Sequence, residues 1–165
     1  MLVKTPVRRA RRIPARGFTL VELCVVIALV ALIGAIATPG FATFVDSMAA
    51  KATSMDLVAD LAAARAEALK RNAAVTVSPL GGDWANGWRV VSGDVVLGER
   101  GALRTGMSLS APAAGVTFQP SGRLGDSDVA VANMRWSVAS TTSDVQPRCI
   151  VITPTGSARV FKGTC

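Results

Sequence analysis

Residues 18–37 form an apolar run of twenty residues that contains a single charge, Glu22. At about 1.5 Å rise per residue, a helix of this length spans a hydrocarbon core of roughly 30 Å. The pattern therefore predicts a membrane-spanning helix over residues 18–38. A carboxylate inside such a helix costs about 2.5–3.5 kcal/mol on insertion scales, and such residues are usually functional. Glu22 is the first candidate functional residue.

The hydrophobic pattern changes after Pro39 and Gly40, which predict a kink or local melting of the helix. Apolar residues then recur at three- and four-residue spacings, which predicts an amphipathic helix over residues 39–72. Its apolar stripe needs a cover, which the following β segments can supply. The stripe consists of Phe41, Phe44, Val45, Met48, Met55, Val58, Ala62, Ala66 and Leu69.

Residues 73–165 are predicted to form a small antiparallel β domain. Gly93-Asp94 separates two apolar segments and predicts a two-residue hairpin turn, whereas residues 101–114 are predicted to be mostly loop. A long helix followed by an antiparallel sheet is an α+β arrangement. The predicted strands are 73–78, 87–92, 95–98, 116–119, 129–138, 148–153 and 158–162.

The formal net charge of +7 is concentrated at the N-terminus, where residues 1–16 contain six basic side chains and no acid. The remaining chain has 12 basic and 11 acidic residues, a net charge of +1. A basic flank before an apolar helix is typical of a cytoplasmic N-terminus, which places the later residues across the membrane. The basic side chains are Lys4, Arg8, Arg9, Arg11, Arg12 and Arg16.

The chain contains no histidine and no tyrosine. The missing histidine excludes Ser-His and Cys-His nucleophile pairs and removes the commonest metal ligand. A glycine-rich phosphate loop is also missing. We therefore expect a protein that is not an enzyme and that has no metal site or cofactor.

The six residues Gly17-Phe-Thr-Leu-Val-Glu22 precede the uninterrupted apolar run. This arrangement resembles the class III signal of type IV pilins and type II secretion pseudopilins. In that family a prepilin peptidase cuts the Gly–Phe bond, the new N-terminus is methylated, and the helix stays on the protein. The resemblance implies a cleaved leader over residues 1–17, processing at Gly17 and Phe18, and pairing of Glu22 with the Phe18 amine of a neighbouring subunit.

Three other interpretations of the N-terminus remain. A secretory signal would be cleaved at the small residues 35–37, but its apolar core is normally 7–15 residues long. A lipoprotein signal would use Cys24, but Leu23 before it is not small. A plain one-pass anchor would leave Glu22 without a function. The length of the run and its carboxylate favour the pilin-like interpretation.

Further motifs resemble the GspH/FimT group of minor pseudopilins and minor pilins. They are the helix end at residues 64–72 followed by Val75-Thr76-Val77, the W-x-x-G-W motif at residues 84–88, and the F-x-P-x-G motif at residues 118–122. The resemblance implies a structural subunit of a type IV pilus or type II secretion pseudopilus. Its partners would be other subunits, prepilin peptidase and the bacterial inner membrane.

The later motifs also have a structural interpretation, which we favour. Tryptophans can stack on bases, but Trp84 and Trp88 lie beside a turn and are expected in the core. Gly87 is expected to supply a backbone conformation that other residues resist. Residues 120–122 are expected to form a turn.

Cys149 and Cys165 are close in sequence, and in an oxidising periplasm they are expected to form one disulfide. Two free thiols are the alternative for a cytosolic protein, which the export signal disfavours. Cys24 lies in the predicted membrane helix and is expected to pack as a small apolar residue.

The chain has three cations and no acid from Arg148 onward, namely Arg148, Arg159 and Lys162. A disulfide would hold them on one β element, which could bind phosphates. Minor pilins of the FimT kind carry a basic G-R-x-R stretch implicated in DNA capture. The corresponding residues 156–159 have Ser157 in place of the first arginine. A DNA receptor for natural transformation is thus the alternative function, and a solvated surface is the simpler interpretation of these cations.

Overall fold

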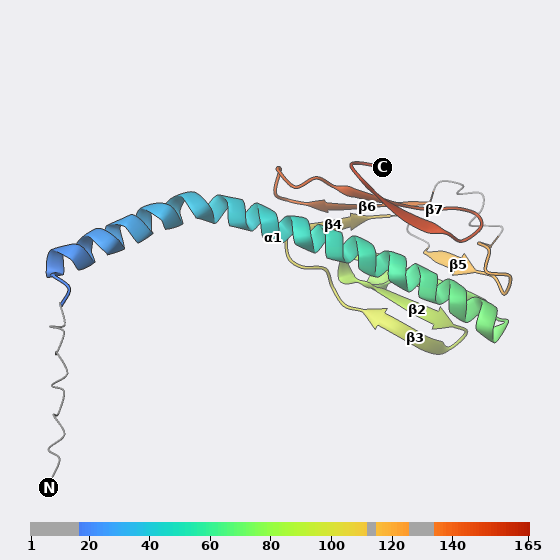
Figure 1. Cartoon of the computed structure of the whole chain (residues 1–165). Helices are drawn as coiled ribbons and strands as arrows, with labels where there is room; N and C mark the ends of the chain where they lie inside the picture. Colours follow the sequence, from blue (N-terminus) through green and yellow to red (C-terminus); the bar gives the residue numbers. More distant parts are fainter. Residues whose placement is uncertain (1–16, 112–114, 126–133) are drawn as a thin grey trace, which may run out of the picture. The chain divides into compact units, whose positions relative to one another are not determined.

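The computed structural model describes residues 17–111, 115–125 and 134–165 (Figure 1). The chain divides into two compact units, Met1–Thr38 and Pro39–Cys165, and we describe each by itself. The helix α1, Leu20–Arg71, contributes residues to both units and is continuous through Pro39 and Gly40. Of the kink or local melting predicted at these two residues, local melting is not observed, and the kink stays a prediction.

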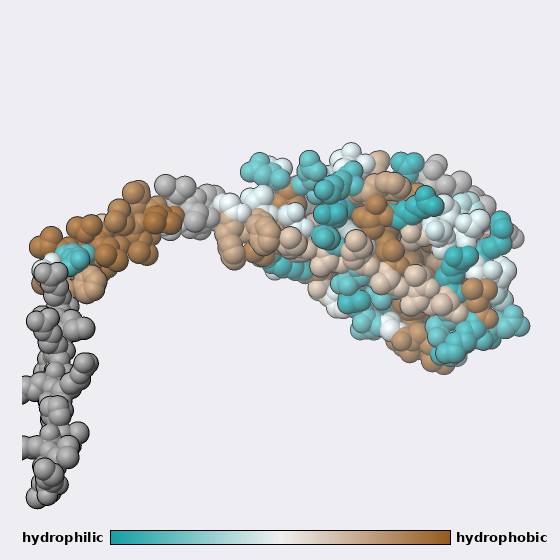
Figure 2. Space-filling model, in the orientation of Figure 1, coloured by the Kyte–Doolittle hydropathy of each residue, from teal (hydrophilic) through white to brown (hydrophobic). Residues whose placement is uncertain are grey.

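The first unit contains the apolar part of α1, whose large side chains are exposed from Leu20 to Ile33 and appear as a brown surface in Figure 2. Within the described residues, no single helix is long and apolar enough to cross a membrane, and Leu20–Ala35 and Gly40–Arg71 meet that requirement only as a bent pair. The membrane-spanning helix over residues 18–38 stays a prediction.

In the second unit, α1 packs against the β-strands through a stripe of mostly small residues. These residues recur at three- and four-residue spacings, and all are fully buried: Ala50, Ser54, Leu57, Leu61, Ala64 and Ala68. The predicted cover of the apolar stripe is wrong in part: Val45 and Val58 are half-buried and Val58 packs against the core, but the large side chains are exposed, namely Phe41, Phe44, Met48, Met55 and Leu69. The helix has two apolar stripes, and the alanine-rich one allows the closer approach to the sheets.

One antiparallel sheet contains four strands in the order β3-β2-β1-β5. Ser92 pairs with Val95 across Gly93-Asp94, which confirms the predicted hairpin turn. Before β2, two short 3₁₀ segments, Leu80–Gly82 and Trp84–Asn86, connect it to β1. The strands are β1 (Val75–Pro79), β2 (Trp88–Ser92), β3 (Val95–Arg100) and β5 (Val116–Phe118).

A second antiparallel sheet has the order β4-β6-β7-β8, so the described β residues form two sheets. The prediction of loop over residues 101–114 is wrong in part, because β4 lies there with Met107 and Leu109 buried. Residues 129–133 of the predicted strand 129–138 lie outside the described residues. The strands are β4 (Met107–Ser110), β6 (Arg135–Ser140), β7 (Arg148–Ile152) and β8 (Ala158–Lys162).

Figure 1 shows the second part of α1 lying along the strands of the second unit, and buried residues of α1 and of both sheets form one core cluster. Trp84 and Trp88 belong to it, with 3% and 2% of their surfaces exposed. Trp84 lies edge-on to Trp136, with ring centroids 5.8 Å apart. The core interpretation of the two motif tryptophans is confirmed, and so is the α+β fold.

Gly87 has a φ of 97°, in the region that favours glycine. A Cβ at this position would lie 2.0 Å from the carbonyl oxygen of Arg100 and 2.5 Å from that of Gly101. Both contacts are with backbone, so no side-chain rotation relieves them. The predicted conformational role of Gly87 is therefore confirmed.

We expect Gly87→Ala to lower the free energy of unfolding by about 3–5 kcal/mol, because it combines overpacking with a disfavoured backbone conformation. Thermal or urea unfolding of the full chain in detergent measures this loss. Gly98→Ala in β3 is the control, since Gly98 has an ordinary φ and open space around it. Its effect should stay within about 1 kcal/mol. Similar losses in both variants would show that the backbone contact at Gly87 is unimportant.

Candidate functional site

The predicted processing residues lie at the start of the first unit. Gly17 and Phe18 precede the first helical residue, Leu20, and both are exposed. Nothing lies within 4 Å of the position that a Cβ on Gly17 would occupy. The Gly17–Phe18 bond is thus in non-helical, accessible backbone, which is the form in which a peptidase binds its substrate.

Glu22 lies in the first turn of α1, where its backbone N–H donates to the hydroxyl of Thr19 at 3.2 Å. The Thr19–Glu22 spacing is that of a capping box, in which the residue three positions after the cap is acidic or amide. The positive end of the helix dipole also favours a carboxylate here. Glu22 therefore has a local helix-capping environment in addition to its predicted role between subunits.

The outward side of α1 in the second unit carries the Phe/Met stripe, which we call the outer stripe: Phe41, Phe44, Met48, Met55 and Leu69. Between 48% and 69% of each side chain is exposed. At about 100° per residue, Phe41, Phe44, Met48 and Met55 lie roughly opposite the buried stripe that contains Leu57 and Leu61, whereas Leu69 lies at the edge of the outer stripe and lines a groove with residues 156–158. The helix thus presents one apolar side to its own sheets and another to solvent.

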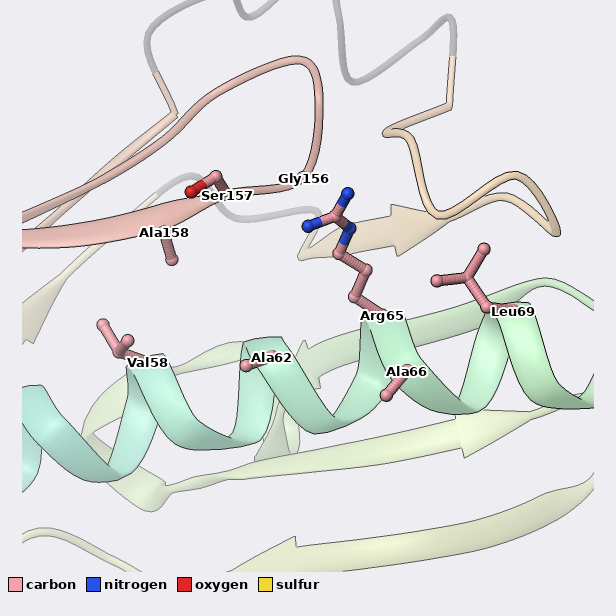
Figure 3. Close-up of a pocket in the computed structure, with 8 residues that line it drawn as sticks. All are labelled: Val58, Ala62, Arg65, Ala66, Leu69, Gly156, Ser157 and Ala158. Atoms are coloured by element: carbon pink, nitrogen blue, oxygen red, sulfur yellow. The ribbon is translucent and has the colours of Figure 1, made fainter.

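The helix-to-sheet junction motif and the F-x-P-x-G motif meet at Arg65. Its Nε donates to the carbonyl oxygen of Gly122 at 2.9 Å, and Gly122, with a φ of 72°, closes a turn on Gln119. The predicted turn at residues 120–122 is confirmed. Figure 3 shows Arg65 beside Gly156, and the groove of about 390 Å³ here is lined by Val58, Ala62, Arg65, Ala66, Leu69 and residues 156–158.

Cys149 and Cys165 are joined by a disulfide, with Cα atoms 5.0 Å apart, and Cys24 is free. Cys149 is in β7, whereas Cys165 follows β8. Gly163 also donates its N–H to the carbonyl oxygen of Pro147 at 2.8 Å. The predicted pairing is confirmed, and it closes the open end of the β7–β8 hairpin.

Replacing Cys149 and Cys165 together by serine should cost about 2–4 kcal/mol of stability, because the reduced chain loses a closed loop of 16 residues. Thermal unfolding of oxidised wild type and of the double variant measures the difference. Reduced wild type should behave like the double variant. Cys24→Ser serves as the control and should leave the unfolding temperature of the second unit unchanged. Equal stability with and without the bond would contradict this expectation.

The three candidate DNA-binding cations lie on one hairpin but not on one face of it. Arg148 is directly opposite Lys162, whereas Arg159 is opposite Val151. Because side chains alternate along a strand, Arg159 points to the opposite side of the sheet from Lys162. DNA binding by all three residues stays a prediction, but the structure does not bring them together.

Other cations of the second unit form ion pairs. Lys70 and Arg71 pair with Glu67, and the hydrogen bond from Arg71 is the main reason why the pKa of Glu67 is lowered. Arg100 pairs with Asp56 and Asp60, and Arg104 with Asp46. Lys70 and Arg71 share one acid and keep a net charge of +1, whereas Arg100 and Arg104 each contact at least one acid of α1.

The acids Asp46 and Asp60 have tertiary roles that the sequence analysis missed. Asp60 accepts the indole N–H of the buried Trp88 at 2.9 Å. Asp46 binds Arg104 and the hydroxyl of Thr142, each at 2.7 Å. Neither acid has a Lys or Arg three or four residues away in the sequence, unlike Glu67. That absence of a local partner is the signal that could have indicated a tertiary one.

No cluster of three or more His, Cys, Asp or Glu side chains that could hold a metal ion occurs in the described parts of the chain. The candidate surfaces in these parts are the accessible residues Gly17 and Phe18, Glu22 in the first turn of α1, the outer stripe, and the β7–β8 hairpin with its disulfide.

Two family profiles match the chain. The profile described as "Type II transport protein GspH" matches residues 53–156, and the "Prokaryotic N-terminal methylation motif" matches residues 13–38. No curated protein matches the sequence.

Solved structures of minor pilins and pseudopilins have the same fold. The type IV minor pilin FimU of Pseudomonas aeruginosa superposes with a TM-score of 0.57 at 20% identity, over 73% of this chain and 92% of FimU. The minor pseudopilin EpsH from the Type 2 Secretion System of Vibrio cholerae gives a TM-score of 0.52 at 13% identity, over 68% and 96%. The GspH profile matches residues 53–156, which is more than half of the chain. The chain therefore belongs to the GspH family of minor pilins and pseudopilins, which are structural subunits and not enzymes.

Proposed function

We propose that this chain is a minor subunit of a type II secretion pseudopilus or a type IV pilus. Prepilin peptidase cuts it between Gly17 and Phe18, and residues 18–38 hold it in the bacterial inner membrane before assembly. Its N-terminus is cytoplasmic and its second unit is periplasmic. The methylation-motif match over residues 13–38 and the basic flank of residues 1–16 support this topology.

The outer stripe of α1 is the single observation that carries the proposal. Its five large side chains are exposed although the same helix buries its opposite side completely at Leu57 and Leu61. Fully burying a side chain of this size contributes about 1.5–3 kcal/mol. The occupant of the stripe is the corresponding helix of a neighbouring subunit. A helical bundle along the filament axis would cover the stripe.

The proposal predicts that polar substitutions on the outer stripe weaken assembly. Met48→Gln with Met55→Gln should lower the amount of chain in sheared filaments by tenfold or more, because about 2 kcal/mol of apolar burial is lost. Membrane levels and unfolding temperature should stay near wild type, since both side chains are exposed. Immunoblots of the filament and membrane fractions measure the ratio.

Val95→Gln is the matched control, because Val95 in β3 is 54% exposed and Met55 is 53% exposed. It should assemble like wild type. Equal losses for the two kinds of variant would show that the outer stripe is not the assembly surface. We do not extend the proposal to DNA binding, because Arg159 lies on the opposite face from Arg148 and Lys162.

A further inference from the structure

We propose that Arg148 and Lys162 form a binding site for the phosphate of an anionic phospholipid headgroup. The site lies at the open end of the β7–β8 hairpin, beside Ser47 of α1. The inference rests on the membrane insertion proposed above, and it assigns to this hairpin a ligand that the subunit contacts before it enters a filament.

The first support is a pair of like charges, neither of which forms an ion pair with an acid among the described residues. Arg148 and Lys162 are directly opposite in antiparallel strands, where Cβ atoms are about 4.5–5.5 Å apart and like charges destabilise the sheet. A bound anion between the two side chains would remove the repulsion.

The second support is the hollow that these cations line. It has a volume of about 190 Å³ and is also lined by Ser47, Asp144, Val145 and Gln146. The Ser47 hydroxyl and the Gln146 amide are additional hydrogen-bond donors. Asp144 leaves the lining with a net charge of +1, which one phosphodiester neutralises. A phosphodiester is the charged group of phosphatidylglycerol.

The third support is rigidity. The disulfide between Cys149 and Cys165 and the Gly163–Pro147 hydrogen bond close the hairpin next to the two cations. Arg148 and Lys162 are therefore held at the same end of one hairpin that a disulfide closes. Less conformational entropy is lost when a ligand binds side chains on such a pre-ordered backbone.

The position of Ser47 along the chain favours a membrane over DNA. Ser47 is only nine residues after Thr38 in the sequence, so the site follows the predicted membrane segment closely along the chain. The headgroup region extends about 5–8 Å beyond each side of the hydrocarbon core, and long basic side chains reach toward it. Binding of duplex DNA would instead require several phosphate contacts on one face of the hairpin. Arg159 lies on the other face and cannot add a contact to those of Arg148 and Lys162.

Lysine acylation in nanodiscs tests this site on the full mature chain. After leader removal the lysines are Lys51, Lys70 and Lys162, so each can be followed by peptide mass spectrometry. The nanodiscs contain phosphatidylcholine alone or with one quarter phosphatidylglycerol. We expect Lys162 to react about fivefold more slowly with phosphatidylglycerol present, the effect of one basic residue at an anionic surface. The rate of Lys70, which pairs with Glu67, should not change.

Two arginine variants separate a built site from general surface charge. Arg148→Gln should abolish the protection of Lys162 by phosphatidylglycerol. Arg159→Gln removes the same charge from the opposite face of the hairpin, and in this variant phosphatidylglycerol should still protect Lys162. An intact Cys149–Cys165 bond, read from the same mass spectra, verifies that each variant is folded. Equal effects of the two substitutions would overturn the proposal.

Soluble competitors in phosphatidylcholine nanodiscs distinguish the source of the phosphate. Millimolar inorganic phosphate should give no protection, and protection by it alone would overturn the lipid assignment. Protection by duplex DNA without any effect of phosphatidylglycerol would overturn it in favour of DNA. Equal Lys162 rates in the two lipids would also overturn it. Failure of the chain to co-purify with nanodiscs would instead contradict the membrane insertion in the proposed function.

Discussion

Glu22→Ala is expected to reach the membrane fraction at or above the wild-type level and to be nearly absent from filaments. Insertion improves because a charge that costs about 2.5–3.5 kcal/mol in the membrane is removed. If Glu22 pairs with the Phe18 amine of a neighbouring subunit, as we propose, assembly fails because that amine is left buried without its counter-charge, at a cost of about 3–5 kcal/mol. The ratio of filament to membrane immunoblot signal should therefore fall at least a hundredfold.

Thr19→Ala is the control for the local role of Glu22. It removes the hydroxyl that accepts the Glu22 N–H and leaves the carboxylate in place. Loss of a cap costs about 1 kcal/mol of helix stability, so filament incorporation should fall far less than in Glu22→Ala. If the two variants lose incorporation equally, helix capping explains the effect. Normal incorporation of Glu22→Ala would show that the residue does not dock subunits.

Gly17→Val is expected to remain uncut when it is co-expressed with prepilin peptidase. The open space around Gly17 means that a side chain disturbs nothing in the chain itself, so any defect must arise in the contact with the peptidase. Intact mass distinguishes the full-length precursor from the product without its seventeen leader residues. Gly34→Ala, inside the apolar run, is the control and should be processed normally. Normal cleavage of Gly17→Val would contradict the assignment of the cut.

The overall architecture followed from hydrophobic periodicity, but the packing face of the helix did not. Both apolar stripes of α1 repeat with helical spacing, and the stripe with larger residues was expected to be covered. In the structure the sheets cover the stripe of Ala50, Leu57, Leu61 and Ala64, since small side chains let the sheets approach. A periodic pattern identifies apolar faces, and tertiary shape decides which one is buried.

The strand pattern had a similar limit. Met107 to Ser110 alternates between apolar and polar residues, but four residues in a glycine-containing region are too short to distinguish β4 from a loop. The register of β7 with β8 also required the structure. It places Arg148 opposite Lys162 and moves Arg159 to the other face, a division that depends on which residues pair.

Local chemistry was the most predictable part of the candidate sites. The turn at Gly122, the conformation of Gly87 and the Cys149–Cys165 pairing all depend on properties of individual residues. The roles of Asp46 and Asp60 depend on partners more than twenty-five residues away, Arg104 and Trp88, and were not predictable. Conformations set by single residues and the cysteine pairing were anticipated, whereas the polar side-chain contacts needed the fold.

The mass of the wild-type chain recovered from sheared filaments tests the account most directly, because it reports processing and incorporation in one measurement. We predict that the chain is present and that it begins at Phe18, with the added mass of one methyl group on its N-terminus. A chain that begins at Thr38, that retains residues 1–17, or that is absent from filaments while present in the membrane would contradict the account.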